Sequence, residues 1–218
     1  MVTEHEVWTI VVAAGSGQRF GANKLDQMLT GNQTVLDATV AVSDRHSTGV
    51  IVVLRAEDPR LGAPSSRNEV RVAGGATRSE SARAGLAAVP HTADIVLIHD
   101  AARPLASDGV FQRVLEAVQG GAAAAVPAVP VVDTIRSKSG ESVDRDSLRA
   151  VQTPQGFSAA VLREAHSTGA EATDDAVLVE ACGHEVVLVD GDVRNLKITN
   201  PADLDVARAL IAGKSSSG

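Results

Sequence analysis

The chain has 218 residues, of which 44% are hydrophobic and only 2% are aromatic. It is long enough to form one domain over residues 1–218 with a substantial core of Val, Ala, Leu and Ile. Such a core is typical of α/β proteins with buried parallel strands. The net charge of -7 argues against general nucleic-acid binding, because a phosphate backbone requires a basic surface.

The chain contains one cysteine, Cys182, which permits no internal disulfide and no multi-thiolate metal site. This cysteine usage favours the reducing environment of the cytoplasm. The apolar run near the N-terminus, about eight residues long, lacks the basic segment of a signal peptide. Because no stretch approaches the roughly 20 apolar residues that cross a bilayer, we expect no membrane association.

Short runs rich in β-branched residues alternate with segments of helical periodicity. In chain order we expect strands at residues 7–13, 50–54, 95–99, 122–129 and 185–190, and helices at residues 77–89, 107–121 and 200–213. This alternation predicts an α/β fold with a mostly parallel, doubly wound sheet. The helices have suitable flanking residues: Ser107 and Asn200 as N-caps, Pro201 at a first helical position, and Gly121 and Gly213 at helix ends.

A polar segment, residues 131–157, interrupts this alternation. It has no helical period and carries two alternating stretches around SKSGES, which is the pattern of a β-hairpin. We expect residues 131–150 to form an arm that projects from the sheet. Because an isolated hairpin is rarely stable, the expected partner of this arm is a second copy of the chain. A disordered insertion is the alternative.

Three glycines, Gly15, Gly17 and Gly21, follow the first expected strand in VVAAGSGQRFGANK. Their spacing differs by one residue from the dinucleotide fingerprint G-x-G-x-x-G, and the P-loop pattern is absent. The acid expected to bind a ribose would be Asp37, which lies within a helical pattern rather than at a strand end. Neither a dinucleotide site nor a P-loop is indicated.

The glycine loop still has the chemistry to hold phosphate groups. Glycines allow backbone N–H groups to approach an anion, and Arg19 and Lys24 supply positive charge. A forked guanidinium and a mobile ammonium both suit phosphate oxygens. On these residues alone, a structural turn with two solvated cations is the alternative.

A second glycine turn precedes the helix expected at residues 77–89. Gly75 is followed by Arg78 and Ser81 in the first turns of that helix. Free backbone N–H groups and a hydroxyl at this place could contact a base or a ribose. A helix cap with polar surface residues is the alternative.

Asp100 follows the strand expected at residues 95–99. Open α/β sheets bind ligands at this edge, and a carboxylate there is a natural Mg²⁺ ligand. The alternative is a turn in which Arg103 pairs with Asp100. The preceding residue, His99, is expected to have a structural role only.

Two later segments add polar residues. Thr173 is the expected N-cap of a helix in ATDDAVLVEACG, and Lys197 lies between the last strand and the last helix. The chain order would return Lys197 to the sheet edge that carries Asp100, although isolated exposed lysines usually have no role.

Seven segments of the chain together resemble the bacterial 2-C-methyl-D-erythritol 4-phosphate cytidylyltransferases of the non-mevalonate isoprenoid pathway, over roughly residues 7–212. In order, they are AAGSGQRFGANK, VAGGATRSES, HDAARP, VVDTI, VDRDSLRAVQTPQGF, TDDAVLVE and VDGDVRNLKIT. HDAARP and TPQGF carry most of the specificity of this resemblance.

The resemblance implies a Rossmann-like nucleotidyltransferase fold and a homodimer with interlocking arms. The implied reaction joins CTP and 2-C-methyl-D-erythritol 4-phosphate, with Mg²⁺, to give 4-diphosphocytidyl-2-C-methyl-D-erythritol and pyrophosphate. Two alternatives remain open: a cytidylyltransferase for another polyol phosphate such as ribitol 5-phosphate, and a non-catalytic nucleotide-binding homologue.

The resemblance also implies roles for individual residues. The implied catalytic cations are Arg19, Lys24, Lys197 and Arg145, the last reaching from the partner's arm, and the implied metal ligand is Asp100. The implied CTP-binding residues are Ala13, Ala14, Gly15, Gly17, Gly75, Arg78, Ser81, Asp100 and Ala101. The residues implied to bind the alcohol phosphate are Asp100, Arg103, Thr134, Arg145, Thr153, Thr173 and Lys197.

The chain departs from the family pattern in two places. NKLDQ stands around Lys24 where many members have Pro-Lys-Gln after a longer spacer, and the arm between Thr134 and Arg145 is shorter.

Overall fold

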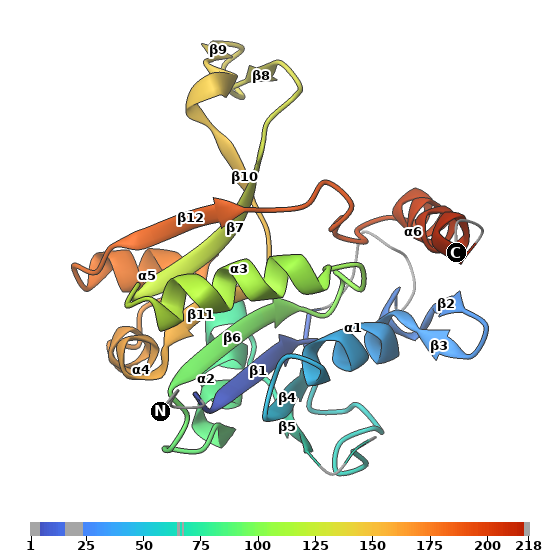
Figure 1. Ribbon diagram of the computed structural model, residues 1–218, viewed down its shortest axis with the longest axis vertical. Coiled ribbons are helices and arrows are strands. Elements are labelled where there is room, and N and C mark those ends of the chain that lie inside the picture. The colour runs from blue at the N-terminus through green and yellow to red at the C-terminus, as the bar shows by residue number, and fades with distance from the viewer. Residues whose placement is uncertain (1–4, 16–23, 65, 67, 216–218) are drawn as a thin grey trace.

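The computed structural model describes residues 5–15, 24–64, 66 and 68–215. Their centre is an eight-stranded, mostly parallel sheet (Figure 1). Strands β5, β4, β1, β6, β11 and β7 follow one another across it, while β10 and β12 also pair with β7. Their bounds are β1 Val7–Val12, β4 Gly49–Leu54, β5 Glu69–Ala73, β6 Ile95–Asp100, β7 Ala124–Pro130, β10 Arg149–Val151, β11 Gln155–Ser158 and β12 Val186–Asp190.

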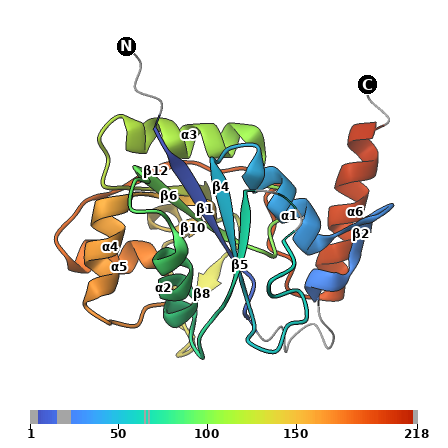
Figure 2. The same cartoon turned by 90° about the horizontal axis from the view of Figure 1, so that it is seen from below.

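Helices cover both faces of the sheet, as Figure 2 shows. On one face, α2, α4 and α5 pack over a core that includes Ile10, Leu86 and Leu162. On the other face lie α1, α3 and α6, where Leu36 and Phe111 are buried. The bounds are α1 Val35–Asp44, α2 Arg78–Ala88, α3 Asp108–Gln119, α4 Ala159–Ser167, α5 Asp175–Ala181 and α6 Pro201–Ser215. The predicted doubly wound α/β fold is confirmed.

Most of the predicted element boundaries are confirmed within two residues. Asn200 caps α6, because its Oδ1 accepts a hydrogen bond of 3.1 Å from the backbone N–H of Asp203. Two end assignments were wrong. Asp174, rather than Thr173, is the N-cap of α5, since its side chain accepts from the backbone N–H of Ala176. Gly213 lies inside α6, which runs on to Ser215.

The predicted arm projects from the sheet (Figure 1). It contains two short paired strands, β8 (Ile135–Arg136) and β9 (Ser142–Val143), and a 3-10 turn, η3 (Arg145–Ser147). Gly140 closes the hairpin with a φ of +91°, a conformation that favours glycine. The polar segment extends beyond the predicted arm of residues 131–150, and its last residues form β11, which enters the sheet between β6 and β7.

Strand β1 lies at the point where the winding of the sheet reverses. The chain runs from β1 to β4 and β5 on one side, and then returns to β6 on the other side. Val12 and Asp100 are register partners at the carboxyl ends of β1 and β6. Open α/β sheets bind ligands in the crevice at such a switch point.

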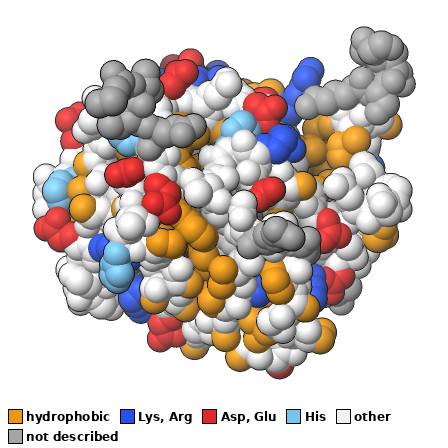
Figure 3. Space-filling model, turned by 60° about the horizontal axis from the view of Figure 1, so that its bottom comes forward, with side chains coloured by type: hydrophobic (Ala, Val, Ile, Leu, Met, Phe, Trp, Pro, Cys, Tyr) orange, Lys and Arg blue, Asp and Glu red, His pale blue; other side chains and the backbone are white. Residues whose placement is uncertain are grey.

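One face of the molecule has a mixed charge character. On the face drawn in Figure 3, acidic and basic side chains are interspersed rather than gathered by sign. None of the helices within the described ranges combines the length and the apolar character needed to cross a membrane.

Candidate active site

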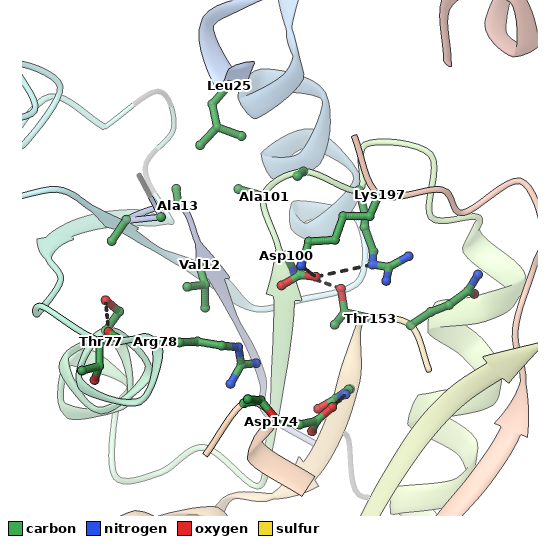
Figure 4. A pocket seen from close by; sticks show the side chains of 18 of the residues that line it. Val12, Ala13, Leu25, Thr77, Arg78, Asp100, Ala101, Thr153, Asp174 and Lys197 are labelled. Atoms are coloured by element: carbon green, nitrogen blue, oxygen red, sulfur yellow. Dashed lines mark hydrogen bonds and ion pairs between the residues drawn. The ribbon is translucent and has the colours of Figure 1, made fainter. Parts of the chain in front are cut away.

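A cavity of about 540 Å³ opens at the carboxyl ends of β1 and β6 (Figure 4). It is lined by segments that are far apart in the sequence but meet at this edge of the sheet. The lining residues are 12–15, 24–25, 75–78, 81, 100–103, 151–153, 155, 173–174 and 197. The volume falls in the range of sites for small molecules.

Most of the residues selected from the sequence line this cavity: Ala13, Ala14, Gly15, Lys24, Gly75, Arg78, Ser81, Asp100, Ala101, Arg103, Thr153, Thr173 and Lys197. Gly17 and Arg19 lie outside the described residues. Thr134 and Arg145 are on the arm and do not line the cavity of their own chain. In place of a ligand contact, Arg145 donates a hydrogen bond of 2.5 Å to the carbonyl oxygen of Val132.

Asp100 forms the charged centre of the cavity. Lys197 Nζ lies 2.8 Å from Asp100 Oδ2, and Arg103 Nε lies 3.5 Å from the same oxygen. Burial raises the pKa of Asp100, but the charges of Lys197 and Arg103 outweigh it and hold the pKa below its ordinary value. Asp100 is therefore ionised at neutral pH, with two cations beside it.

A buried hydrogen-bond chain fixes the backbone at Asp100. Burial lowers the pKa of His99 to about 4, so its imidazole is neutral. Nε2 of His99 must donate, because its partner is the carbonyl oxygen of Arg103 at 3.2 Å. Nδ1 then accepts from the hydroxyl of Thr153 at 2.8 Å, and Thr153 Oγ1 accepts from the N–H of Asp100 at 2.9 Å. The structural role expected for His99 is consistent with this series of hydrogen bonds.

Side-chain amides hold the loop that carries Lys197. Gln152 Nε2 donates to the carbonyl oxygen of Asp192 at 2.9 Å, and Asn195 Nδ2 donates to that of Thr153 at 2.8 Å. Beyond Lys197, the carbonyl oxygen of Ile198 accepts a hydrogen bond of 3.0 Å from Lys24 Nζ. Lys24 is thus joined to the loop that carries Lys197, and both lysines line the cavity.

The turn before α2 has little space for side chains. A Cβ on Gly74 would lie 2.7 Å from Ser81 Oγ and 2.8 Å from the Cβ of Ala14. A Cβ on Gly75 would lie 2.3 Å from the Cβ of Glu80, a member of the capping box with Thr77. Glycine is therefore needed at both positions for the turn to pack against β1 and the first turn of α2.

Arg78 extends from the start of α2 across the cavity (Figure 4). Its Nη2 lies 2.6 Å from Oδ2 of the buried Asp175. Oδ1 of Asp175 accepts from His166 Nε2 at 3.1 Å. Burial by itself lowers the pKa of Arg78, but the charge and the hydrogen bond of Asp175 outweigh this effect. The pKa of Arg78 is therefore raised above its ordinary value, and the guanidinium keeps its charge.

The carboxylate of Asp100 suits a divalent cation. Within the described residues, no group of three or more His, Cys, Asp or Glu side chains could hold a metal ion. Mg²⁺ is commonly held by one or two carboxylates together with the phosphates of a substrate. The donor set therefore fits an ion that arrives with a nucleotide better than an ion held by the protein alone.

Sequence reasoning missed several lining residues. Gln155 and Asp174 are joined by a hydrogen bond of 2.8 Å from Nε2 to Oδ2, and Gln152 holds the loop of Lys197. Asp174 follows Thr173 directly, so the same signal could have identified it. The glutamines give no pattern on their own, because their role depends on where β11 enters the sheet.

Comparisons with known proteins agree with this geometry. The family model for 2-C-methyl-D-erythritol 4-phosphate cytidylyltransferase matches residues 7–213. An enzyme of that name from Thermus thermophilus is 43% identical over 213 residues, which cover 94% of this chain and 97% of that protein. The one from Streptomyces avermitilis is 38% identical over 226 residues, covering 93% of this chain and 90% of that protein.

Solved structures agree as well. The crystal structure of the cytidylyltransferase from Thermus thermophilus matches with a TM-score of 0.81 and 42% identity, and covers 94% of this chain and 98% of that one. A 4-diphosphocytidyl-2C-methyl-D-erythritol synthase from Anaerococcus prevotii matches with a TM-score of 0.81 at 28% identity, over 95% of this chain and 99% of that one. With its Rossmann-like nucleotidyltransferase fold, the chain belongs to the 2-C-methyl-D-erythritol 4-phosphate cytidylyltransferase family.

Proposed function

We propose that the cavity joins CTP and 2-C-methyl-D-erythritol 4-phosphate, giving 4-diphosphocytidyl-2-C-methyl-D-erythritol and pyrophosphate. The observation that carries this proposal is the meeting of Lys24, Asp100, Arg103 and Lys197 at the β1–β6 crevice. Two anionic substrates must be brought together there, and the protein as a whole carries a net charge of -7. A local group of cations is therefore required.

The phosphate of the alcohol is the nucleophile. It attacks the α-phosphorus of CTP, a new P–O bond forms, and the bond to the pyrophosphate leaving group breaks. Because the second pKa of a phosphomonoester is about 6, this group is already largely ionised at pH 7 and needs no general base. The cations that line the cavity suit this chemistry, which requires no nucleophilic serine or cysteine.

The residues of the chain would then divide the work by position. Backbone groups of Ala13, Ala14 and Gly15 and the side chain of Lys24 face the triphosphate, and the same task is proposed for Gly17 and Arg19 of the glycine loop. Gly75, Ser81 and Ala101 face the nucleoside, and Lys197, Arg103, Thr153 and Thr173 face the alcohol phosphate. Fixed cations align the two anions and stabilise the negative charge that develops at the α-phosphorus.

Asp100 would hold Mg²⁺, which is the cofactor that we propose for this site. When bound, the ion neutralises phosphate oxygens and helps to orient the triphosphate. Asp100 suits this task because Lys197 and Arg103 keep its pKa low against the effect of burial.

The active form that we propose is a homodimer, in which Thr134 and Arg145 complete the site of the partner chain. The projecting arm and the 77% exposure of Val132 support this arrangement. The low cysteine content supports a cytoplasmic location. No nucleic acid or membrane takes part in the proposed reaction.

The test is a CTP-dependent pyrophosphate-release assay with Mg²⁺ and a panel of alcohol phosphates. Fast release with 2-C-methyl-D-erythritol 4-phosphate, and much slower release with ribitol 5-phosphate or erythritol 4-phosphate, is the expected result. Binding of CTP without release for any alcohol phosphate would instead indicate a non-catalytic homologue. Preference for ribitol 5-phosphate would change the substrate but not the reaction.

A further inference from the structure

Two residues that line the cavity each bury a polar atom without a hydrogen-bond partner among the described residues. These atoms are Nη1 of Arg78, a donor, and Oε1 of Gln155, an acceptor. Gln155 is only 1% exposed. The two side chains share a neighbour, because both interact with Asp174. Since buried polar atoms are nearly always paired in folded proteins, each of the two atoms indicates a ligand group or a bound water beside it.

Neighbouring carboxylates fix the orientation of both side chains. Nη2 of Arg78 is held by Asp175 at 2.6 Å, and Asp175 is fully buried. Nε2 of Gln155 donates to Asp174 at 2.8 Å, so its Oε1 must face away from that carboxylate. Asp174 cannot easily move, because it also caps α5 through a hydrogen bond of 2.8 Å from the N–H of Ala176.

The local charge shows what kind of group fits there. Among the residues that the structure describes, two carboxylates, Asp174 and Asp175, lie beside the guanidinium of Arg78, and they offset its positive charge. This part of the cavity is therefore poorly suited to a phosphate. A hydroxyl group is neutral and can accept one hydrogen bond and donate another. It could therefore accept from Arg78 Nη1 and donate to Gln155 Oε1.

We infer that Arg78 and Gln155 together bind a hydroxyl group of the alcohol phosphate and so discriminate between polyols. This inference rests on the proposed function, and it assigns Arg78 to the alcohol rather than to CTP. Figure 4 shows the guanidinium directed toward Asp174 and away from Ala13 of the glycine loop. Gln155 follows Thr153 by two residues, and it lines the same cavity as Asp100 and Lys197.

Two variants test this inference, and each removes one of the two unpartnered atoms. Gln155→Met keeps the length of the side chain and removes Oε1. Arg78→Lys keeps a positive charge for Asp175 but loses the second nitrogen of the fork. We expect each variant to lower kcat/KM for 2-C-methyl-D-erythritol 4-phosphate by roughly 10- to 100-fold, while KM for CTP stays within about twofold.

Arg83→Lys is the matched control, because Arg83 lies on the same helix and pairs with Glu171 at the surface, outside the cavity. It should leave both constants unchanged. Thermal unfolding of all three variants shows whether any of them has lost its fold. A larger effect on KM for CTP than on KM for the alcohol would overturn the inference and return Arg78 to the nucleotide.

Monodeoxy analogues of the alcohol phosphate identify the bound hydroxyl. The parent enzyme should reject one analogue by roughly 10- to 100-fold in kcat/KM, and Gln155→Met should lose most of this discrimination because the missing groups are partners. Equal discrimination by parent and variant would show that only water occupies the pair, and would overturn the inference. If the parent released no pyrophosphate with any alcohol phosphate, the proposed function itself would fail.

Discussion

Thr153 shows how one hydroxyl can organise a charged centre. Its Oγ1 accepts from the N–H of Asp100 at 2.9 Å and donates to His99 Nδ1 at 2.8 Å. Both side chains are buried, since His99 is 0% exposed and Thr153 is 5% exposed. The hydroxyl therefore holds the carboxyl end of β6 against the start of β11, in addition to the substrate contact that we propose for it.

Replacing Thr153 by Val should destabilise the protein. Val has nearly the same shape but leaves a buried donor and a buried acceptor without partners, at a cost of about 2 to 4 kcal/mol in the free energy of unfolding. Thr153→Ser keeps the hydroxyl and should cost less than about 1.5 kcal/mol. Urea unfolding of both variants checks this, and equal losses would show that the methyl group matters rather than the hydroxyl.

Asp58 should make the free energy of unfolding depend on pH in the acidic range. The hydrogen bond from the Arg60 side chain, working against burial, lowers its pKa from 3.8 to about 2. A carboxyl with a lowered folded-state pKa stabilises the protein above its unfolded value of 3.8. That contribution, about 1 to 2 kcal/mol after allowance for screening, is lost as the pH falls through about 2.

Asp58→Asn tests this assignment. Between pH 4 and pH 2 the parent should lose about 1 to 2 kcal/mol more unfolding free energy than the variant, because only the parent takes up a proton at this site. Urea unfolding at several pH values measures the difference. Parallel curves for the two proteins would show that Asp58 does not contribute to the acid dependence.

At the scale of elements, an ion-pair chain supports the turn that carries Lys24. Arg60 binds Asp58 through Nε at 2.8 Å and Nη2 at 2.7 Å, and its Nη1 reaches Asp26 Oδ1 at 2.7 Å. Asp26 ends the 3-10 turn η2 (Lys24–Asp26). Asp26 belongs to NKLDQ, the segment in which the sequence departs from the family pattern. The ion pair with Arg60 therefore supports this turn through one of the residues that differ from that pattern.

Asp26→Asn weakens this series of ion pairs and leaves Lys24 in the sequence. Because the side chain of Asp26 is 48% exposed, its ion pair with Arg60 should contribute only about 0.5 to 1 kcal/mol. We expect KM for CTP to rise by roughly two- to fivefold, with little change in KM for the alcohol phosphate. Asp205→Asn, which alters a surface pair on α6, is the matched control. If both variants behave alike, the turn is held by other contacts.

The elements also show what sequence reasoning could and could not predict. Apolar strands followed by helical patterns were readable, and this is why the strand ends with Ala13 and Asp100 were placed correctly. Strand β11 was missed because QGFS has no apolar alternation, although Phe157 is fully buried. The cap of α5 was misplaced by one residue because Thr173 and Asp174 both have suitable side chains.

The candidate site was predictable to a similar degree. Residues at the ends of parallel strands converge for topological reasons, so Asp100, Lys197, Gly15 and Gly75 could be grouped from the sequence alone. Gln155 could not be included, because its position depends on an antiparallel strand inserted between two parallel neighbours. The hydrogen bonds of Gln152 and Asn195 depend on loop conformation, which no local pattern specifies.

At the scale of the whole molecule, the arm projects from the sheet, and its residues 131–150 do not line the cavity of their own chain. Strands β8 and β9 have two residues each, and hairpins of this size are not stable without further packing. Arg145 is directed to the carbonyl oxygen of Val132 within the arm. The proposed homodimer gives both the arm and Arg145 a partner, and it requires that each site combine residues of two chains.

Mixed dimers test this requirement directly. Arg145→Ala and Lys197→Ala chains should each be nearly inactive, with losses of about 10²- to 10³-fold in kcat, because each lacks a fixed cation at the α-phosphorus or at the attacking phosphate. Equal mixing with subunit exchange makes half of the dimers mixed, and each has one intact site, so activity should return to about a quarter of the parent value. A double variant, Arg145→Ala with Lys197→Ala on one chain, mixed with Lys197→Ala is the control and should restore nothing, since neither site then contains a Lys197. If mixed dimers form, as shown by differently tagged chains, and activity stays low, then Arg145 does not act across the interface and each cavity must work with the residues of one chain.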